Sequence, residues 1–149
     1  FFLFSPEYLL ELYVKKPEAV RRGYLHMLLH CLYLHLFREN QEDRRLWNLA
    51  CDIAVEQIIS REKIPVLETG GNEKKIREKV FHMLGNGADS AEKICQKLKD
   101  QVFLFRLEEM EEAFHFDDHS LWDACTGEKG KKTKEKWNIL KRMYRFRNI

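Results

Sequence analysis

Two histidines four residues apart, His26 and His30, stand in the apolar segment YLHMLLHCLYLHLF. Residues at this spacing lie on one face of a helix, one turn above the other. Two imidazole rings stacked in this way can ligate a single Zn²⁺ ion through their ring nitrogens. This pair is therefore the first candidate for chemistry in the chain.

The helix that carries the pair is expected to begin at Pro17 and to run to about residue 37. Leucine and aromatic residues cover nearly its whole circumference, and a helix that is apolar all round is buried all round. A polar turn over residues 38–43 separates it from a second helix, expected over residues 44–60. A connection this short makes the two helices antiparallel neighbours.

The antiparallel arrangement places a carboxylate opposite each histidine. At a rise of about 1.5 Å per residue, Asp52 is level with His30 and Glu56 is level with His26. Two nitrogens and the Asp52 oxygen form a usual three-ligand set for catalytic zinc. His35 lies about 180° around the helix from His26, so it needs a local break in the helix to reach the same ion.

The same residues also fit a second interpretation. His26 and His30 can form a buried hydrogen-bond network with Asp52 and Glu56, which satisfies polar groups that are costly to bury alone. The spacing favours the metal site, and the network stays open as the alternative.

The segment HFDDHSLW supplies two histidines and two aspartates within five residues. It is expected to fold over the helical histidines, either as a further ligand or as a source of carboxylates that orient the imidazole rings. His119 is the first alternative to Asp52 for the third ligand. The competing interpretation is a helix start capped by Asp118 or Ser120.

The rest of the chain is predicted to be mainly α. Further helices are expected over residues 6–13, 73–84, 89–99 and 133–146, separated by polar or glycine-containing turns. The segment over residues 103–113 fits a short strand or a helix equally, so a minor strand element stays open.

Composition indicates one globular domain. The chain has 149 residues, 44% hydrophobic and 34% charged, and its net charge of +2 is too small to indicate a polyanionic partner. The basic tail over residues 129–147 is interpreted as an amphipathic helix that docks on the domain, so nucleic acid is not expected as a partner. No apolar run approaches the ~20 residues of a membrane span, so no membrane partner is expected either.

The four cysteines are scattered and form no C-x-x-C pair, which is typical of reduced thiols in a cytoplasmic protein. They are Cys31, Cys51, Cys95 and Cys125. The sequence begins with Phe1, and we interpret it as a piece of a longer protein.

Four blocks of the sequence together resemble a bacterial family of metallopeptidase-like domains. The blocks are YLHMLLHCLYLH, LWNLACDIAVE, SAEKICQKL and FDDHSLW, within a match that runs from about residue 25 to residue 137. The family pattern matches at His26 and His30, at Trp47, Ala50 and Asp52, and at Asp117, Asp118, His119 and Trp122. The resemblance implies a zincin-like helical core, a zinc ion, and a peptide or protein as substrate or partner.

In that family the domain precedes a von Willebrand factor A-like domain. The resemblance therefore implies that residues 1–149 are a single domain of a longer chain. It implies a von Willebrand A-like domain C-terminal to it, and an AAA+ ATPase as a candidate partner.

The sequence departs from the family at Met27, where peptidase members carry the glutamate of H-E-x-x-H. Methionine cannot take a proton from a zinc-bound water, and loss of a general base costs about 10²–10⁴ in rate. Glu56 and Asp118 are candidate substitutes for the base, and the sequence favours neither. The predicted function is a pseudoenzyme that binds metal through a degenerate H-x-x-x-H motif, with hydrolysis impaired or lost. The alternative is a metal-free protein-interaction scaffold.

Overall fold

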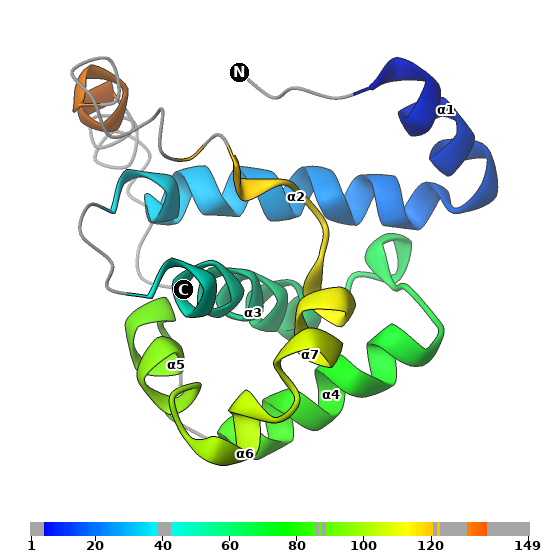
Figure 1. Cartoon of the computed structure of the whole chain (residues 1–149). Helices are drawn as coiled ribbons and strands as arrows, with labels where there is room; N and C mark the ends of the chain where they lie inside the picture. Colours follow the sequence, from blue (N-terminus) through cyan, green and yellow to red (C-terminus); the bar gives the residue numbers. More distant parts are fainter. Residues whose placement is uncertain are drawn as a thin grey trace.

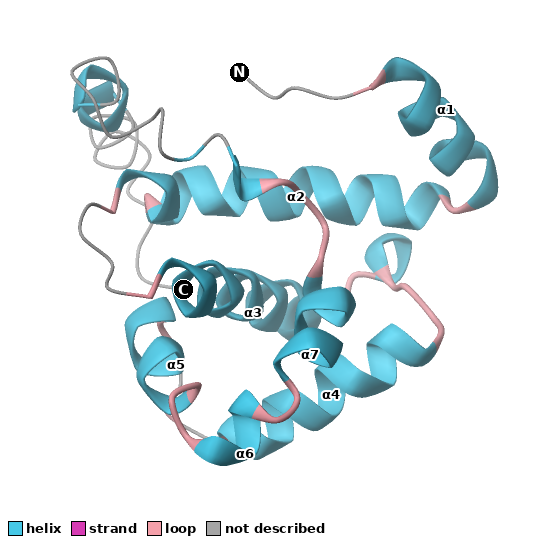
Figure 2. Ribbon diagram, viewed as in Figure 1, coloured by secondary structure: helices cyan, strands magenta, loops and turns pink. Residues whose placement is uncertain are grey.

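The computed structural model describes residues 5–38, 43–85, 87, 89–120, 122 and 131–136. Every regular element in these ranges is a helix, as Figure 2 shows, and this confirms the predicted mainly α fold. The α-helices are α1 (Pro6–Lys15), α2 (Pro17–Tyr33), α3 (Arg44–Glu62), α4 (Asn72–Leu84), α5 (Ala91–Lys97), α6 (Gln101–Leu104) and α7 (Leu107–Phe114). Two short 3-10 helices are η1 (His35–Phe37) and η2 (Pro65–Leu67).

Helices α1 and α3 begin at capping side chains. The Ser5 hydroxyl oxygen accepts a hydrogen bond from the backbone N–H of Tyr8, and the Asp43 carboxylate accepts one from Leu46 at 3.0 Å. Each cap satisfies a backbone donor that has no partner inside its helix. The start of the second predicted helix, at about residue 44, is thus explained by its cap.

The segment over residues 103–113 is helical. It contains the end of α6 and most of α7, so no strand occurs there or elsewhere in the described part of the chain. Helix α7 buries Met110, Ala113 and Phe114. Ala113 and Phe114 follow Met110 by three and four residues, so all three side chains lie on one face of the helix. Of the final helix predicted over residues 133–146, residues up to 136 are described and are helical, and the remainder lies outside the described ranges.

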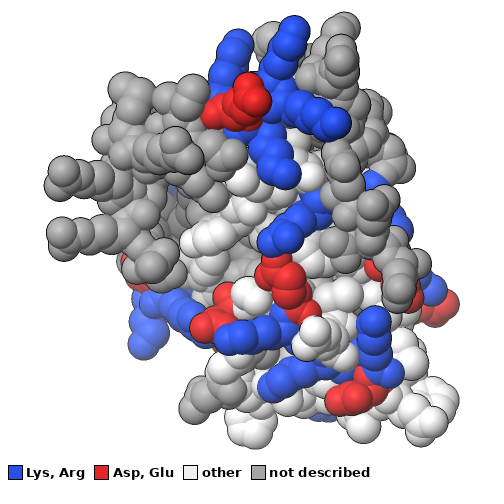
Figure 3. Space-filling model, turned by 90° about the vertical axis from the view of Figure 1, so that its left-hand side faces the viewer, with Lys and Arg blue, Asp and Glu red and all other residues white. Residues whose placement is uncertain are grey.

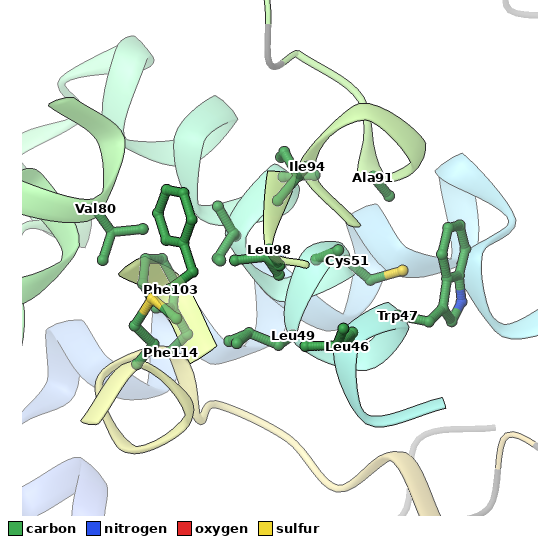
Figure 4. Packing of buried hydrophobic residues seen from close by; sticks show 14 of the residues in the cluster. Leu46, Trp47, Leu49, Cys51, Val80, Ala91, Ile94, Leu98, Phe103 and Phe114 are labelled. Atoms are coloured by element: carbon green, nitrogen blue, oxygen red, sulfur yellow. The ribbon is translucent and has the colours of Figure 1, made fainter. Parts of the chain in front are cut away.

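Helix α3 forms the centre of the fold. Twelve of its nineteen residues are buried, and α2, α5 and α7 all pack against it (Figure 1). Figure 4 shows Ile94 of α5 and Leu98, which follows α5, in the same hydrophobic cluster as Cys51 of α3 and Phe114 of α7. The core thus holds α3 rigidly, and the polar side chains that α3 carries toward α2 are held with it.

The prediction that the histidine-bearing helix is buried all round is wrong. The buried side chains of α2 are Arg22, His26 and His30, all of them polar, whereas its leucines are half-buried and Tyr24 is 57% exposed. The physical reason is that α2 lies at the edge of the core and turns its polar stripe toward α3, while Leu25 and Leu29 pack only partly buried beside that stripe, against the small cluster of Val55, Ile59 and Leu67. The helix at the centre of the fold is therefore α3, the one predicted over residues 44–60, and not the histidine-bearing helix α2.

Helices α2 and α3 run antiparallel in the predicted register. Their side chains meet in three pairs. From one pair to the next, the residue number rises by four along α2 and falls by four along α3. The pairs are Arg22 with Ser60 at 3.0 Å, His26 with Glu56 at 3.0 Å and His30 with Asp52 at 3.2 Å. This confirms that Asp52 is level with His30 and Glu56 with His26.

Residues 115–120, which we name the crossing segment, pass in front of α2 in the view of Figure 1 and reach Asp52 of α3 through His119. The Phe116 carbonyl oxygen would lie 3.9 Å from a Cβ placed on Gly23, so the segment's backbone packs directly on the helix. The Phe116 ring lies 5.1 Å from the His26 ring between centroids. The crossing segment thus covers the buried histidines of α2 from outside.

The described charges on the face drawn in Figure 3 are mixed in sign. Basic and acidic side chains lie beside one another there, so that face shows no large patch of one sign among them. None of the helices described has the length and apolar character needed to span a bilayer.

Candidate metal centre

Five donor atoms from three parts of the chain converge on one region. Helix α2 provides two of them, α3 provides one, and the crossing segment provides two. They are Nε2 of His26, Nε2 of His30, Oδ1 of Asp52, Oδ1 of Asp117 and Nε2 of His119.

Most of the distances between these atoms match donors that share one ion, and the distance between the two histidine nitrogens is slightly shorter. Nε2 of His26 lies 2.8 Å from Nε2 of His30 and 3.3 Å from Oδ1 of Asp52. Nε2 of His119 lies 3.0 Å from Oδ1 of Asp52 and 3.0 Å from Oδ1 of Asp117. Zinc binds such ligands at about 2.0–2.2 Å, which sets neighbouring ligands roughly 3.0–3.5 Å apart. The two α2 histidines, Asp52 and Asp117 can therefore hold a metal ion.

The His26 ring is oriented by Glu56 on the side away from the cluster. Oε1 of Glu56 lies 3.0 Å from Nδ1 of His26, and both side chains are fully buried. A carboxylate only accepts hydrogen bonds, so Nδ1 carries the hydrogen and donates it. In the neutral ring the lone pair is then on Nε2, which is the atom that faces Asp52 and Asp117.

Two buried arginines hold Glu56 in place. Nε of Arg22 donates to Oε2 of Glu56 at 2.8 Å, and Nε of Arg77 lies 3.7 Å from the same oxygen. Burial disfavours a charge on Glu56, but its hydrogen bond to His26 and the Arg22 guanidinium outweigh burial and hold the pKa of Glu56 below its ordinary value. Glu56 is thus a charged side chain whose oxygens are already engaged.

The ring of His30 is oriented by His35. Helix α2 ends because Leu34 adopts the left-handed conformation, with φ 62°, and the chain turns into η1. This is the local break that His35 needs, and it brings Nδ1 of His35 to 3.0 Å from Nδ1 of His30. His35 does not reach the donor cluster. Burial lowers the pKa of His35 to about 3, so its ring is neutral and can accept the hydrogen from Nδ1 of His30.

When no metal is bound, protons on the histidines compensate the negative charges of the two aspartates in the cluster. Burial opposes a positive charge on His119, but hydrogen bonds to Asp117 and Asp52 raise the pKa of His119 to about 9. The pKa of His26 is also raised well above its ordinary value, because hydrogen bonds to three carboxylates outweigh burial. The histidines in turn hold the pKa values of Asp52 and Asp117 below their ordinary range, again against burial. Two bound protons therefore neutralise two carboxylates, and a divalent cation would supply the same charge.

A pocket of about 280 Å³ opens beside the cluster. Its lining includes Asp52, Asp117 and His119 of the cluster, so small molecules can approach the cluster from this side. Asn48 also lines it, and the buried Oδ1 of Asn48 has no hydrogen-bond partner within the described residues. Trp122 packs on the His119 ring at 3.9 Å between centroids.

The structure contains features of both interpretations of the site, the metal cluster and the buried hydrogen-bond network. Asp52 faces the donor cluster, as the metal interpretation predicts, while Glu56 belongs to the hydrogen-bond network. His119, predicted as the alternative to Asp52, is present together with it. The third-ligand alternatives are therefore combined in one cluster.

The two candidate substitutes for the general base lie outside the cluster. Glu56 faces Nδ1 of His26, so the ring itself separates Glu56 from the donor atoms. Asp118 is exposed, and its carboxylate accepts hydrogen bonds from the backbone N–H and the hydroxyl of Ser120 at 2.8 and 3.0 Å. Asp118 thus performs the capping role that the sequence offered as its alternative. Met27 is half-buried on α2.

The sequence prediction did not single out Asp117 as a ligand. Asp117 and His119 are two residues apart, and alternate side chains of an extended chain point to the same side. That spacing, applied to HFDDHSLW as extended chain, is the signal that could have identified Asp117 beside His119.

No protein-family model, curated protein or solved structure matches this chain.

Proposed function

We propose that this chain is a zinc-binding domain of zincin-like type, in which the metal is structural and peptide hydrolysis is lost. One observation supports the proposal above all others: the convergence of four donor atoms from α2, α3 and the crossing segment, with His119 in contact with two of them. A group this dense in imidazole and carboxylate is costly to bury unless its charges are compensated.

The donor types support zinc. Magnesium and calcium prefer oxygen ligands, whereas imidazole nitrogen suits zinc and other transition metals. His26 and His30 each have a partner on the second ring nitrogen, Glu56 and His35 respectively. Such partners fix the tautomer and orientation of metal-binding histidines.

The number of donors supports a structural metal. Structural zinc sites use four protein ligands, whereas catalytic sites use three and leave a position for water. His26, His30, Asp52 and Asp117 already provide four, and Nε2 of His119 contacts both aspartates beside them. Met27 at the position of the general base supports the same conclusion, because a hydrolytic water would lack a proton acceptor.

A metal bound here would link the crossing segment to the α2–α3 pair. The free energy of metal binding would then stabilise the fold, because the unfolded chain has no preformed site. The resemblance found in the sequence extends the proposal to a domain of a longer cytoplasmic protein. Such a protein would carry a von Willebrand A-like domain, and a peptide, a protein or an AAA+ ATPase would be its partner.

The second candidate function is the metal-free interaction scaffold. The protonated state favours it, because His26 and His119 with raised pKa values can balance Asp52 and Asp117 without any ion. Metal content distinguishes the two candidates.

The test is the zinc content of protein purified without a polyhistidine tag and without chelator, measured by mass spectrometry of the metal. We expect about one zinc ion per chain, lost in Asp52→Ala and in His30→Ala. The control is His82→Ala, which removes an exposed histidine of α4 far from the cluster in sequence. Absence of zinc from the unmodified protein would favour the scaffold, and chelator-sensitive proteolysis by it would contradict a structural metal.

A further inference from the structure

A second and larger cavity lies on the other side of Glu56 from the donor cluster. Its volume is about 460 Å³, and two of its walls are the arginines that hold Glu56. The lining residues are Arg22, Ser60, Lys63, Glu68, Thr69, Lys74, Arg77, Glu78 and Phe81.

The floor of this cavity carries more positive than negative charge. Arg22 and Arg77 are each 4% exposed, and both face the single carboxylate of Glu56. That carboxylate also accepts the hydrogen bond from His26, so its negative charge is shared among three groups. Two buried guanidinium groups with one carboxylate between them leave one charge without a full partner.

The rim of the cavity is balanced and does not cancel this excess. Lys74 pairs with Glu68 at 2.7 Å, and Lys63 and Glu78 add one charge of each sign. The excess positive charge therefore belongs to the floor.

Two hydroxyl groups beside the arginines are set up as donors. Nη2 of Arg22 donates to the Ser60 hydroxyl oxygen at 3.0 Å, and Nη2 of Arg77 donates to the Thr69 hydroxyl oxygen at 2.7 Å. A hydroxyl that accepts from a guanidinium keeps its own hydrogen, which it can give to a molecule in the cavity. The cavity thus combines cations with O–H donors, which together suit a ligand made of acceptors.

We propose that this cavity binds a phosphate group, either as free phosphate or as a phosphate monoester. A phosphate group near neutral pH carries about one to two negative charges and mostly acceptor oxygens, which suit a positively charged floor with hydroxyl donors. Arg22 and Arg77 already donate to the carbonyl oxygens of Leu67 and Ala113, so they contribute mainly charge. The Ser60 and Thr69 hydroxyls donate to it, and Arg77 supplies charge from the floor. The site lies on the opposite side of Glu56 from the metal centre, and none of its lining residues is a proposed zinc ligand, so phosphate binding should not require zinc.

The experiment is a calorimetric titration of inorganic phosphate into the whole chain in chloride buffer, with and without zinc. We expect saturable binding in both, weakened about tenfold or more in Ser60→Ala/Thr69→Ala, because hydrogen bonds to charged groups are strong. Ser5→Ala, an exposed serine at the start of α1, is the matched control and should bind like the unmodified chain.

A second measurement uses the unmodified chain alone, so it does not depend on variants that fold. Phosphate should shift the Nε–H resonance of Arg77, and methyl phosphate should do so as well if the natural ligand is an ester. Acetate at the same concentration should shift it less. Binding that requires zinc, binding unchanged in the double variant, or no saturation in the millimolar range would overturn the proposal.

Discussion

Oε1 of Glu56 lies 3.0 Å from Nδ1 of His26, and this contact decides which nitrogen of the ring faces the donor cluster. The contact spans two helices, because Glu56 belongs to α3 and His26 to α2. Arg22 fixes the far oxygen of the same carboxylate. Orientation of the proposed zinc ligand therefore depends on a buried chain of three side chains.

Glu56→Gln should weaken zinc binding by about 10–100-fold, which is the usual cost of losing a partner of a metal-binding histidine. The amide can donate to Nδ1 of His26, and the ring would then carry its hydrogen on Nε2 and lose the lone pair that faces the cluster. Competition titration against a chelator of known affinity measures the effect. Glu62→Gln, an exposed glutamate at the end of α3, is the control, and equal affinities in the two variants would argue against the positioning role.

The zinc-free protein should lose stability as pH rises from 6.5 to about 9. The pKa of His119 is raised from 6.5 to about 9 in the folded state, where Asp117 and Asp52 accept its hydrogen bonds against the effect of burial. A raised pKa stabilises the fold fully below the unfolded value and loses that contribution as pH passes through the folded value.

Zinc should reverse this trend, because protons compete with the metal for the same nitrogens. Urea unfolding across this pH interval, with and without zinc, measures both effects. A zinc-free protein whose stability is constant between pH 6.5 and 9 would show that His119 is not held by the two aspartates.

Met27→Glu by itself should not restore hydrolysis, because the proposed site already offers four protein ligands to the metal. The same substitution combined with Asp117→Ala and His119→Ala would open a position for water and supply a base. Its chelator-sensitive cleavage of an unfolded protein substrate should exceed that of the Asp117→Ala/His119→Ala variant by about 10²–10⁴. Comparable cleavage by Met27→Glu alone would show that the coordination is open in the native chain.

The register of α2 and α3 could be predicted because it depends on local quantities. The four-residue spacing of His26 and His30, the short connection and the helical rise together place Asp52 and Glu56 opposite them. The structure confirms both pairings. Residue spacing was therefore sufficient to predict the contacts between the histidines of α2 and the carboxylates of α3.

Three other features depend on tertiary structure, which residue spacing alone cannot predict. The break at Leu34 puts a leucine in a left-handed conformation that its residue type disfavours, so the position of His35 could not be predicted. Arg22 is buried because its partner Glu56, 34 positions away, compensates its charge. The central position of α3 results from α5 and α7 packing on it, whereas the apolar circumference of α2 suggested the opposite.

The most direct test of the central claim is X-ray absorption at the zinc edge on the whole chain loaded with one equivalent of zinc. We predict a first shell of four or five nitrogen and oxygen atoms at about 2.0–2.2 Å, with the multiple scattering typical of at least two imidazoles. Asp117→Ala should reduce that shell. A sulfur shell near 2.3 Å, a shell without imidazole, or failure of the chain to bind zinc would contradict the assignment of His26, His30, Asp52 and Asp117 as ligands.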